Sequence, residues 1–104
     1  MIRINVIKKN NIIDTIILKG HANYDEYGKD IVCAAVSATY LCTVNAILSL
    51  NNNSIDIITE HNLQVIKVLE IDKITISLLN NMINCLESLQ KQYPKNINLD
   101  KEEK

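Results

Sequence analysis

The sequence has no phenylalanine and no tryptophan, and its 104 residues include only two glycines and one proline. A core must therefore be filled by isoleucine, valine and leucine, and the first two of these favour β-strands. The four tyrosines are the only aromatic side chains. A chain of this length supports one domain with a single modest core.

An excess of charge is also missing, since 11 Lys and Arg residues face 12 Asp and Glu residues, for a net charge of −1. Without a basic stripe, we expect no direct binding to nucleic acid or to an anionic membrane surface. No run of about 18 residues is free of polar side chains, and residues 1–5 alternate instead of forming a secretory signal. We therefore expect a cytoplasmic protein with no membrane contact.

The three cysteines form no CxxC pair and are odd in number. This argues against a disulfide framework and favours free thiols in a reducing compartment. The gaps between His21, Asp30, Cys33 and Cys42 match none of the short paired spacings of zinc modules, so no metal or other cofactor is expected.

Apolar residues alternate with polar ones in four segments and recur at helical spacing in two more. The order is strand, strand, helix, strand, strand, helix, which predicts an α+β fold with a mostly antiparallel sheet and two helices packed on one face. The strands are expected near 2–6, 12–19, 55–59 and 63–68, and the helices at 30–50 and 72–93. Residues 1–99 form the predicted domain. Residues 100–104 are expected to be a polar tail, with at most a short extended piece at 96–99.

The first predicted helix is apolar on almost every side, from Ile31 to Leu50. Such a helix is buried on most of its surface, either within the domain or against a second subunit. One sheet face and one further helix can cover only part of it in so small a domain. The sequence therefore predicts a homodimer.

Candidate chemistry lies in the polar loop before this helix, which contains both glycines and His21, and in the first helical turn, which contains Cys33. Asp30 is placed to cap the helix. Free N–H groups in the first turn favour a thiolate there and could also hold an oxyanion. The Asp30 carboxylate opposes the thiolate. A cation is therefore needed nearby, and His21 could be both that cation and the general base.

Structural interpretations compete with these. A cysteine in an apolar helix is commonly a small core residue, and we interpret Cys42 and Cys85 in that way. For Cys33 the residues alone leave catalysis and a structural role open. His61 fits a solvated turn. Ser37, one helical turn beyond Cys33, either touches a substrate or bonds to a backbone carbonyl, and the pattern favours the carbonyl.

Two short motifs carry a resemblance to a known family. Gly20-His21-Ala22 and the run from Gly28 to Ser37, Gly-Lys-Asp-Ile-Val-Cys-Ala-Ala-Val-Ser, resemble the signature of the bacterial ribosomal-processing cysteine proteases called Prp. The order of elements and the late Tyr93-Pro94 are also similar, so the resemblance covers roughly residues 1–99.

The resemblance implies a homodimeric peptidase that removes the N-terminal extension from the twenty-seventh protein of the large ribosomal subunit, a step of ribosome maturation. It implies that Cys33 is the nucleophile, that His21 is its base, and that bulky apolar residues precede the cut. It also implies a loop that moves when substrate arrives. Gly20 and Gly28 would be its hinges, with Tyr24 and Tyr27 packing on the peptide. The alternative is a non-catalytic ribosome-associated binding or assembly module.

Overall fold

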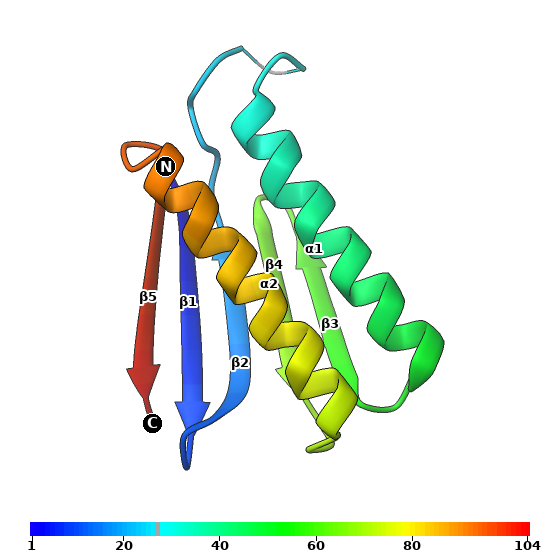
Figure 1. Ribbon diagram of the computed structural model, residues 1–104. Helices are drawn as coiled ribbons and strands as arrows, with labels where there is room; N and C mark the ends of the chain where they lie inside the picture. Colours follow the sequence, from blue (N-terminus) through cyan, green and yellow to red (C-terminus); the bar gives the residue numbers. More distant parts are fainter. Residues whose placement is uncertain (27) are drawn as a thin grey trace.

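The computed structural model describes residues 1–26 and 28–104. Its elements follow the predicted order, with one further strand at the end (Figure 1). They are β1 (Ile2–Lys9), β2 (Ile12–Lys19), α1 (Ile31–Leu50), β3 (Ile55–Glu60), β4 (Leu63–Val68), α2 (Lys73–Gln92) and β5 (Ile97–Glu103).

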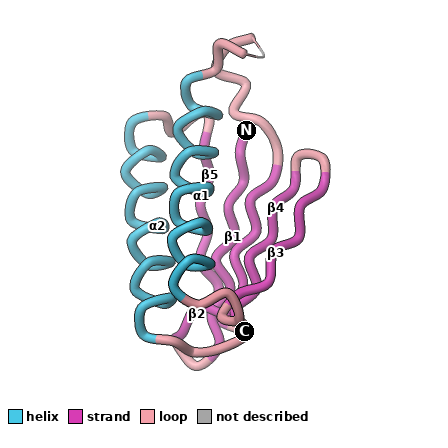
Figure 2. Tube along the Cα trace, turned by 90° about the vertical axis from the view of Figure 1, so that its right-hand side faces the viewer, coloured by secondary structure: helices cyan, strands magenta, loops and turns pink. Residues whose placement is uncertain are grey.

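The strands form one five-stranded sheet in the order β3-β4-β2-β1-β5. All neighbouring pairs are antiparallel except β1 and β5, which are parallel. Both helices cover the same face of this sheet, as Figure 2 shows. The alternating side chains of β1 that face the helices, Ile4 and Val6 among them, are fully buried with Leu79, Met82 and Leu86 of α2. This confirms the predicted α+β class.

The C-terminal strand β5 corrects the prediction of a frayed polar tail. It pairs with β1 along its whole length, from Ile2 beside Ile97 to Lys8 beside Glu103. Ile97 is buried in the core, and Leu99 packs against it. Because its partner strand lies at the other end of the chain, the pairing has no local signal in the sequence, and only the folded sheet supplies it.

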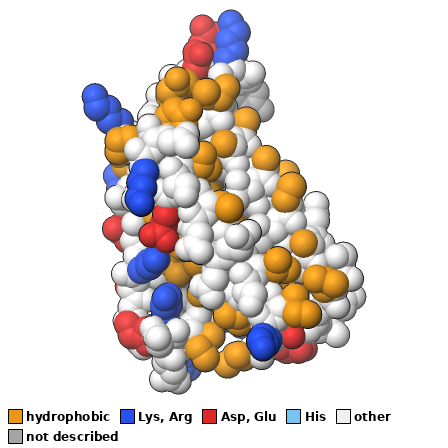
Figure 3. Space-filling view, viewed as in Figure 1, with side chains coloured by type: hydrophobic (Ala, Val, Ile, Leu, Met, Phe, Trp, Pro, Cys, Tyr) orange, Lys and Arg blue, Asp and Glu red, His pale blue; other side chains and the backbone are white. Residues whose placement is uncertain are grey.

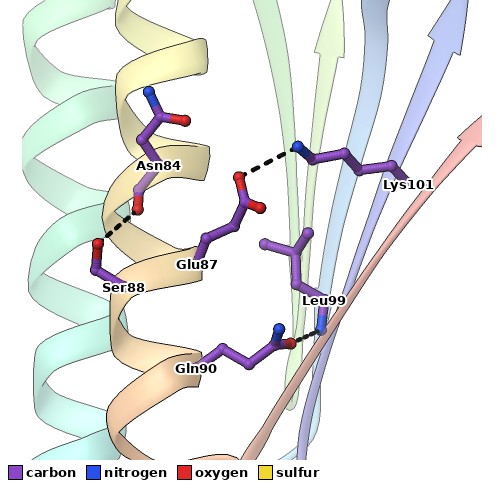
Figure 4. Close-up of polar contacts among 6 residues, drawn as sticks. All are labelled: Asn84, Glu87, Ser88, Gln90, Leu99 and Lys101. Atoms are coloured by element: carbon purple, nitrogen blue, oxygen red, sulfur yellow. Dashed lines mark hydrogen bonds and ion pairs between the residues drawn. The ribbon is translucent and has the colours of Figure 1, made fainter.

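Contacts with α2 hold β5 in place on its helix-facing side (Figure 4). The Gln90 side-chain oxygen accepts the backbone N–H of Leu99. Lys101 Nζ lies 3.2 Å from Glu87 Oε1, in an ion pair whose two side chains are 45% and 39% exposed. An ion pair this exposed contributes little to stability. The parallel ladder and the buried isoleucine therefore do most to hold the strand.

Helix α1 is only partly buried within the protomer, as the sequence predicted. Only Val32, Val36, Tyr40, Val44 and Ile47 are buried, while Ile31, Leu41 and Leu50 are 56%, 53% and 64% exposed. Among the described residues, α1 is the one helix that is long and apolar enough to cross a membrane by length and composition, with a mean hydropathy of 1.9. Figure 3 shows hydrophobic side chains spread along the right-hand side, over α1, whereas charged side chains gather mainly over α2, β5 and the two ends.

The interpretation of two cysteines as core residues is wrong. Cys42 on α1 and Cys85 on α2 are both exposed. Each lies in an apolar helical pattern, but the buried stripe of its helix is narrower than the pattern suggests. His61 lies in the turn between β3 and β4 and is exposed, as predicted.

Candidate active site

Cys33 is the third residue of α1, at the end of the molecule where the loop after β2 and the turn between β3 and β4 also lie (Figure 1). The thiol is free and half-buried. His21, Asp30 and Cys33 all line one groove of about 930 Å³, together with Gly20 and Gly28. The fold thus places the predicted nucleophile, base and capping residue on one cavity.

Asp30 caps α1 as predicted and also holds the loop. Its Oδ1 atom accepts the backbone N–H groups of Val32 and Cys33, each at 3.0 Å. Its Oδ2 atom accepts the N–H of Tyr24 at 3.0 Å and that of Asp25 at 3.5 Å. Burial acts to raise the pKa of Asp30, but these backbone bonds and a bond from the Cys33 thiol together lower it. The carboxylate is therefore ionised at neutral pH.

This cap changes the predicted source of charge stabilisation. The N–H groups of Val32 and Cys33 already donate to Asp30, so they are not free to hold a thiolate or an oxyanion. An anion at the sulfur also lies beside a carboxylate that opposes it. The expectation that the first-turn amides do this work is wrong for these two residues.

A different backbone N–H reaches the sulfur. Ala22 N donates to Cys33 Sγ at 3.2 Å. The Ala22 side chain is only 1% exposed, and its carbonyl accepts a hydrogen bond from Asn96 Nδ2 at 3.0 Å. Neither residue was predicted to have a role at the site. For Ala22, the signal in the sequence was a small apolar residue between His21 and a run of polar residues. Asn96 has no local signal, because it lies 74 residues from Ala22.

His21 is exposed and stands between two residues that are held in place. On one side is Ala22, and on the other is Gly20, whose N–H donates to Asn62 O at 2.9 Å. Gly20 has a φ of +94°, and a Cβ there would lie 2.7 Å from the backbone oxygen of Met1. Gly28 has a φ of +86° but nothing within 4 Å of a Cβ. Glycine is therefore required at position 20 for space as well as for conformation.

The predicted substrate-contacting residues have different surroundings. Tyr24 stacks edge-on against Tyr93, with ring centroids 5.4 Å apart, and it is not among the residues that line the groove. Tyr27 lies outside the described residues. Ser37 is exposed and lines the groove. Within the described part of the chain its hydroxyl makes no hydrogen bond, so the favoured prediction of a bond to a backbone carbonyl is wrong there. Thr39 on the same helix does donate to a carbonyl four residues earlier.

The remainder of the groove runs between α1 and the strands beside it. Its lining there is mainly apolar and includes Leu18, Val36, Tyr40, Leu41, Val44, Leu48 and Ile57. Burial raises the pKa of Tyr40, against the opposing effect of a hydrogen bond to Thr59 of β3. Thr59 Oγ1 in turn donates to Gln64 Oε1 at 2.9 Å. Across residues 1–26 and 28–104, no group of three His, Cys, Asp or Glu side chains could hold a metal ion.

Comparison with known proteins identifies the family. The family model described as "Cysteine protease Prp" matches residues 1–98. The chain belongs to this family. It is 33% identical over 91 residues to the ribosomal processing cysteine protease Prp of Staphylococcus aureus, covering 85% of this chain and 86% of that protein. This Prp family member is therefore a cysteine protease.

Solved structures agree with this assignment. The essential ribosomal processing protease Prp from S. aureus, in complex with a covalently linked product peptide, superposes with a TM-score of 0.94 at 29% identity, covering 98% of this chain and 100% of that one. The same protease in complex with a substrate peptide gives a TM-score of 0.87 at 28% identity, with the same coverage. The shared Prp fold extends over nearly the whole chain.

Proposed function

We propose that this Prp family member removes the N-terminal extension from the twenty-seventh protein of the large ribosomal subunit, with Cys33 as nucleophile and His21 as base. The observation that carries this proposal is that both side chains line one groove of about 930 Å³. The S. aureus relative, a ribosomal processing protease, has been captured with a covalently linked product peptide. The matching family and groove support the same chemistry here.

The reaction follows from the chemistry of a thiol beside an imidazole. His21 takes the proton of the Cys33 thiol, and the sulfur forms a bond to the scissile carbonyl carbon while the carbonyl π pair moves onto oxygen. Collapse of this intermediate breaks the C–N bond, and His21 returns its proton to the departing amine. A water molecule deprotonated by His21 then cleaves the thioester and restores the thiol.

The imidazole has a second role, because of Asp30. The Asp30 carboxylate is a negative charge next to Cys33, with its Oδ1 atom 3.0 Å from the Cys33 backbone nitrogen, so it repels negative charge on the sulfur. A positive charge on His21 compensates for this when the thiolate forms. The ion pair of Cys33 and His21 is therefore the reactive state in this proposal, and Asp30 is a capping and orienting residue.

The apolar part of the groove accounts for substrate selection. Leu41 is 53% exposed and lies beside the buried Val44 on the α1 wall, with Ile57 of β3 on the other. Such a surface binds bulky apolar side chains of an extended peptide by removing them from water. It thus fits the apolar residues that precede the cut in the implied substrate. Ser37, exposed between this part and Cys33, is positioned to contact the peptide.

We further propose that the enzyme works in the cytoplasm as a homodimer. The exposed apolar side chains of α1, Ile31, Leu41 and Leu50, supply surface for a second copy. The net charge of −1 gives no electrostatic drive toward ribosomal RNA, so the ribosomal protein itself is the proposed partner.

The test is incubation with the unprocessed ribosomal protein of the same organism, followed by mass measurement of the products. The wild-type protein should release one N-terminal fragment, and Cys33→Ala should release none. Cys42→Ala is the matched control, because this exposed thiol lies on the same helix away from the groove. Cleavage by Cys33→Ala near the wild-type rate would exclude Cys33 as the nucleophile. Wild-type protein that leaves the substrate intact would exclude the proposed substrate.

A further inference from the structure

The active site needs a hydrogen-bond donor that stabilises the negative charge of the reaction. The donor commonly used, the backbone N–H of the nucleophile, is already bonded here. In a protease with a nucleophile at a helix start, the backbone N–H of the nucleophile itself commonly points at the developing oxyanion. Here the Cys33 N–H donates to Asp30 Oδ1 at 3.0 Å, and the Val32 N–H does the same. A group elsewhere in the chain has to supply the missing donor.

We propose that the backbone N–H of Ala22 is this catalytic donor and that Asn96 is its positioning residue. The inference rests on the proposed role of Cys33 as nucleophile. Ala22 N lies 3.2 Å from Cys33 Sγ, with its hydrogen directed at the sulfur. This backbone N–H therefore contacts the reacting atom itself.

Negative charge moves from the sulfur to the carbonyl oxygen in the first step of the reaction. In the thiolate, the negative charge lies on Sγ, where the Ala22 N–H already points. When sulfur bonds to the carbonyl carbon, the charge moves to the carbonyl oxygen, which is attached to the same carbon. Because this oxygen is bonded to the carbon that the sulfur attacks, a substrate bound with the oxygen on the Ala22 side brings it to the same N–H without movement of Ala22. A preorganised donor of this kind is worth most where charge develops and water is excluded.

The surroundings of Ala22 make it rigid enough for this role. Its side chain is 1% exposed, so it is packed into the core. Its carbonyl accepts a hydrogen bond from Asn96 Nδ2 at 3.0 Å. Asn96 is itself fixed, because its N–H donates to Tyr93 O at 3.0 Å and its carbonyl accepts from Ile2 N at 2.9 Å. The turn between α2 and β5 therefore fixes the residue whose N–H faces the nucleophile.

The direct test removes only this N–H. Lactic acid replaces alanine at position 22 in the full chain, assembled by ligating a thioester of residues 1–32 to residues 33–104 at Cys33. The matched control is the alanine chain assembled in the same way. We expect kcat to fall by about 10²-fold to 10³-fold, the usual effect of deleting one oxyanion donor. A peptide aldehyde, which forms a tetrahedral adduct with the sulfur, should bind more weakly by a similar factor.

The same experiment contains the result that would overturn the proposal. The affinity for the cleaved product peptide, which forms no tetrahedral centre, should stay within about threefold of the control. If the ester chain keeps its kcat and aldehyde affinity, Ala22 is not the donor. If product and aldehyde affinity fall together, the bond serves binding only. A ligated alanine chain that fails to cleave substrate points instead to a failure of the proposed function.

Asn96→Ala tests the positioning residue, with Asn98→Ala as the matched control. Asn98 lies two residues further on, in β5, and its side chain makes an exposed bond to Asp100 that does not involve the loop. Asn96→Ala should lower kcat and aldehyde affinity by a smaller factor than the ester, with KM little changed. A purely structural role predicts that both variants lose the same fraction of kcat when each is assayed at the same interval below its own melting temperature.

Discussion

The carboxylate of Asp30 accepts the backbone N–H of Cys33 at 3.0 Å, so the residue that caps α1 also fixes the residue that carries the thiol. The other carboxylate oxygen accepts the N–H of Tyr24. One side chain therefore joins the helix start to the loop that follows His21. Disturbing it should affect both stability and catalysis.

Asp30→Ala should destabilise the protein by about 1 kcal/mol, the typical effect of losing an N-cap, whereas Asp30→Asn should retain part of the cap. The pKa of Asp30 is lowered from its ordinary value of 3.8 by hydrogen bonds from the backbone. The stability that comes from its charge is thus fully present above about pH 4 and is lost as the pH falls through the lowered pKa. Urea unfolding at several pH values should show the free energy of unfolding of the wild type approaching that of Asp30→Asn in acid. A difference in free energy that stays constant with pH would contradict this.

Cys33 should react with iodoacetamide below pH 8 faster than either of the other cysteines. Cys42 and Cys85 are exposed, whereas Cys33 is half-buried and so less accessible to the reagent. Access alone therefore predicts the opposite order, and faster alkylation of Cys33 must come from its activation by His21. Mass mapping of the alkylated sites measures the three rates, and His21→Ala should make Cys33 slower than the two exposed thiols.

Mutations of the nucleophile and base should not add. Cys33→Ala and His21→Ala should each reduce turnover severely, and the double variant should be little worse than the slower single one, because the two groups act as a unit. Fragment release from the ribosomal protein, followed over time, gives the three rates. Additive losses would show that the two side chains act independently.

The two loop glycines should respond differently to alanine. Gly20→Ala places a Cβ 2.7 Å from the Met1 backbone oxygen, so both stability and activity should fall. Gly28→Ala meets no atom within 4 Å and strains only its positive φ, a cost of about 1–2 kcal/mol. If Gly28 is a hinge, this variant should lose more turnover than stability. Thermal melting and kcat measured together would decide, and equal losses at both positions would exclude a special role for Gly28.

Tyr40 gives a prediction for alkaline solution. Burial raises the pKa of its phenol above the ordinary value of 10.0. The neutral form is favoured in the fold, so this contribution is present below pH 10 and is lost as the pH rises through the raised pKa. Wild type should therefore lose stability above pH 10 more steeply than Tyr40→Phe. Parallel denaturation curves across that range would show that the hydroxyl is not buried in solution.

The exposed face of α1 predicts association. Light scattering at micromolar concentration should give twice the chain mass of 11.8 kDa. Leu50→Lys places a charge on a side chain that is 64% exposed in the protomer. It should weaken the dimer if this end of α1 lies in the interface, and Lys104→Ala serves as a neutral control. A monomeric wild type would leave the apolar face of α1 in water and would contradict the homodimer.

The sequence by itself determined the elements whose signals are local. Period-two alternation predicted four strands, Asp30 as an N-cap predicted the start of α1, and the spacing of His21 and Cys33 around a glycine-bounded loop predicted the candidate pair. These succeed because an N-cap or a half-buried strand depends on residues a few positions apart.

Tertiary structure decided whatever depends on partners distant in the chain. β5 is a strand because β1, at the opposite terminus, offers a free edge. Asn96 reaches Ala22 across 74 positions. Cys42 and Cys85 are exposed because the packing of α1 and α2 leaves those faces uncovered. Composition fixes how apolar a face is, but which face is covered, and which amide points at Cys33, follows from how the helices and strands pack together.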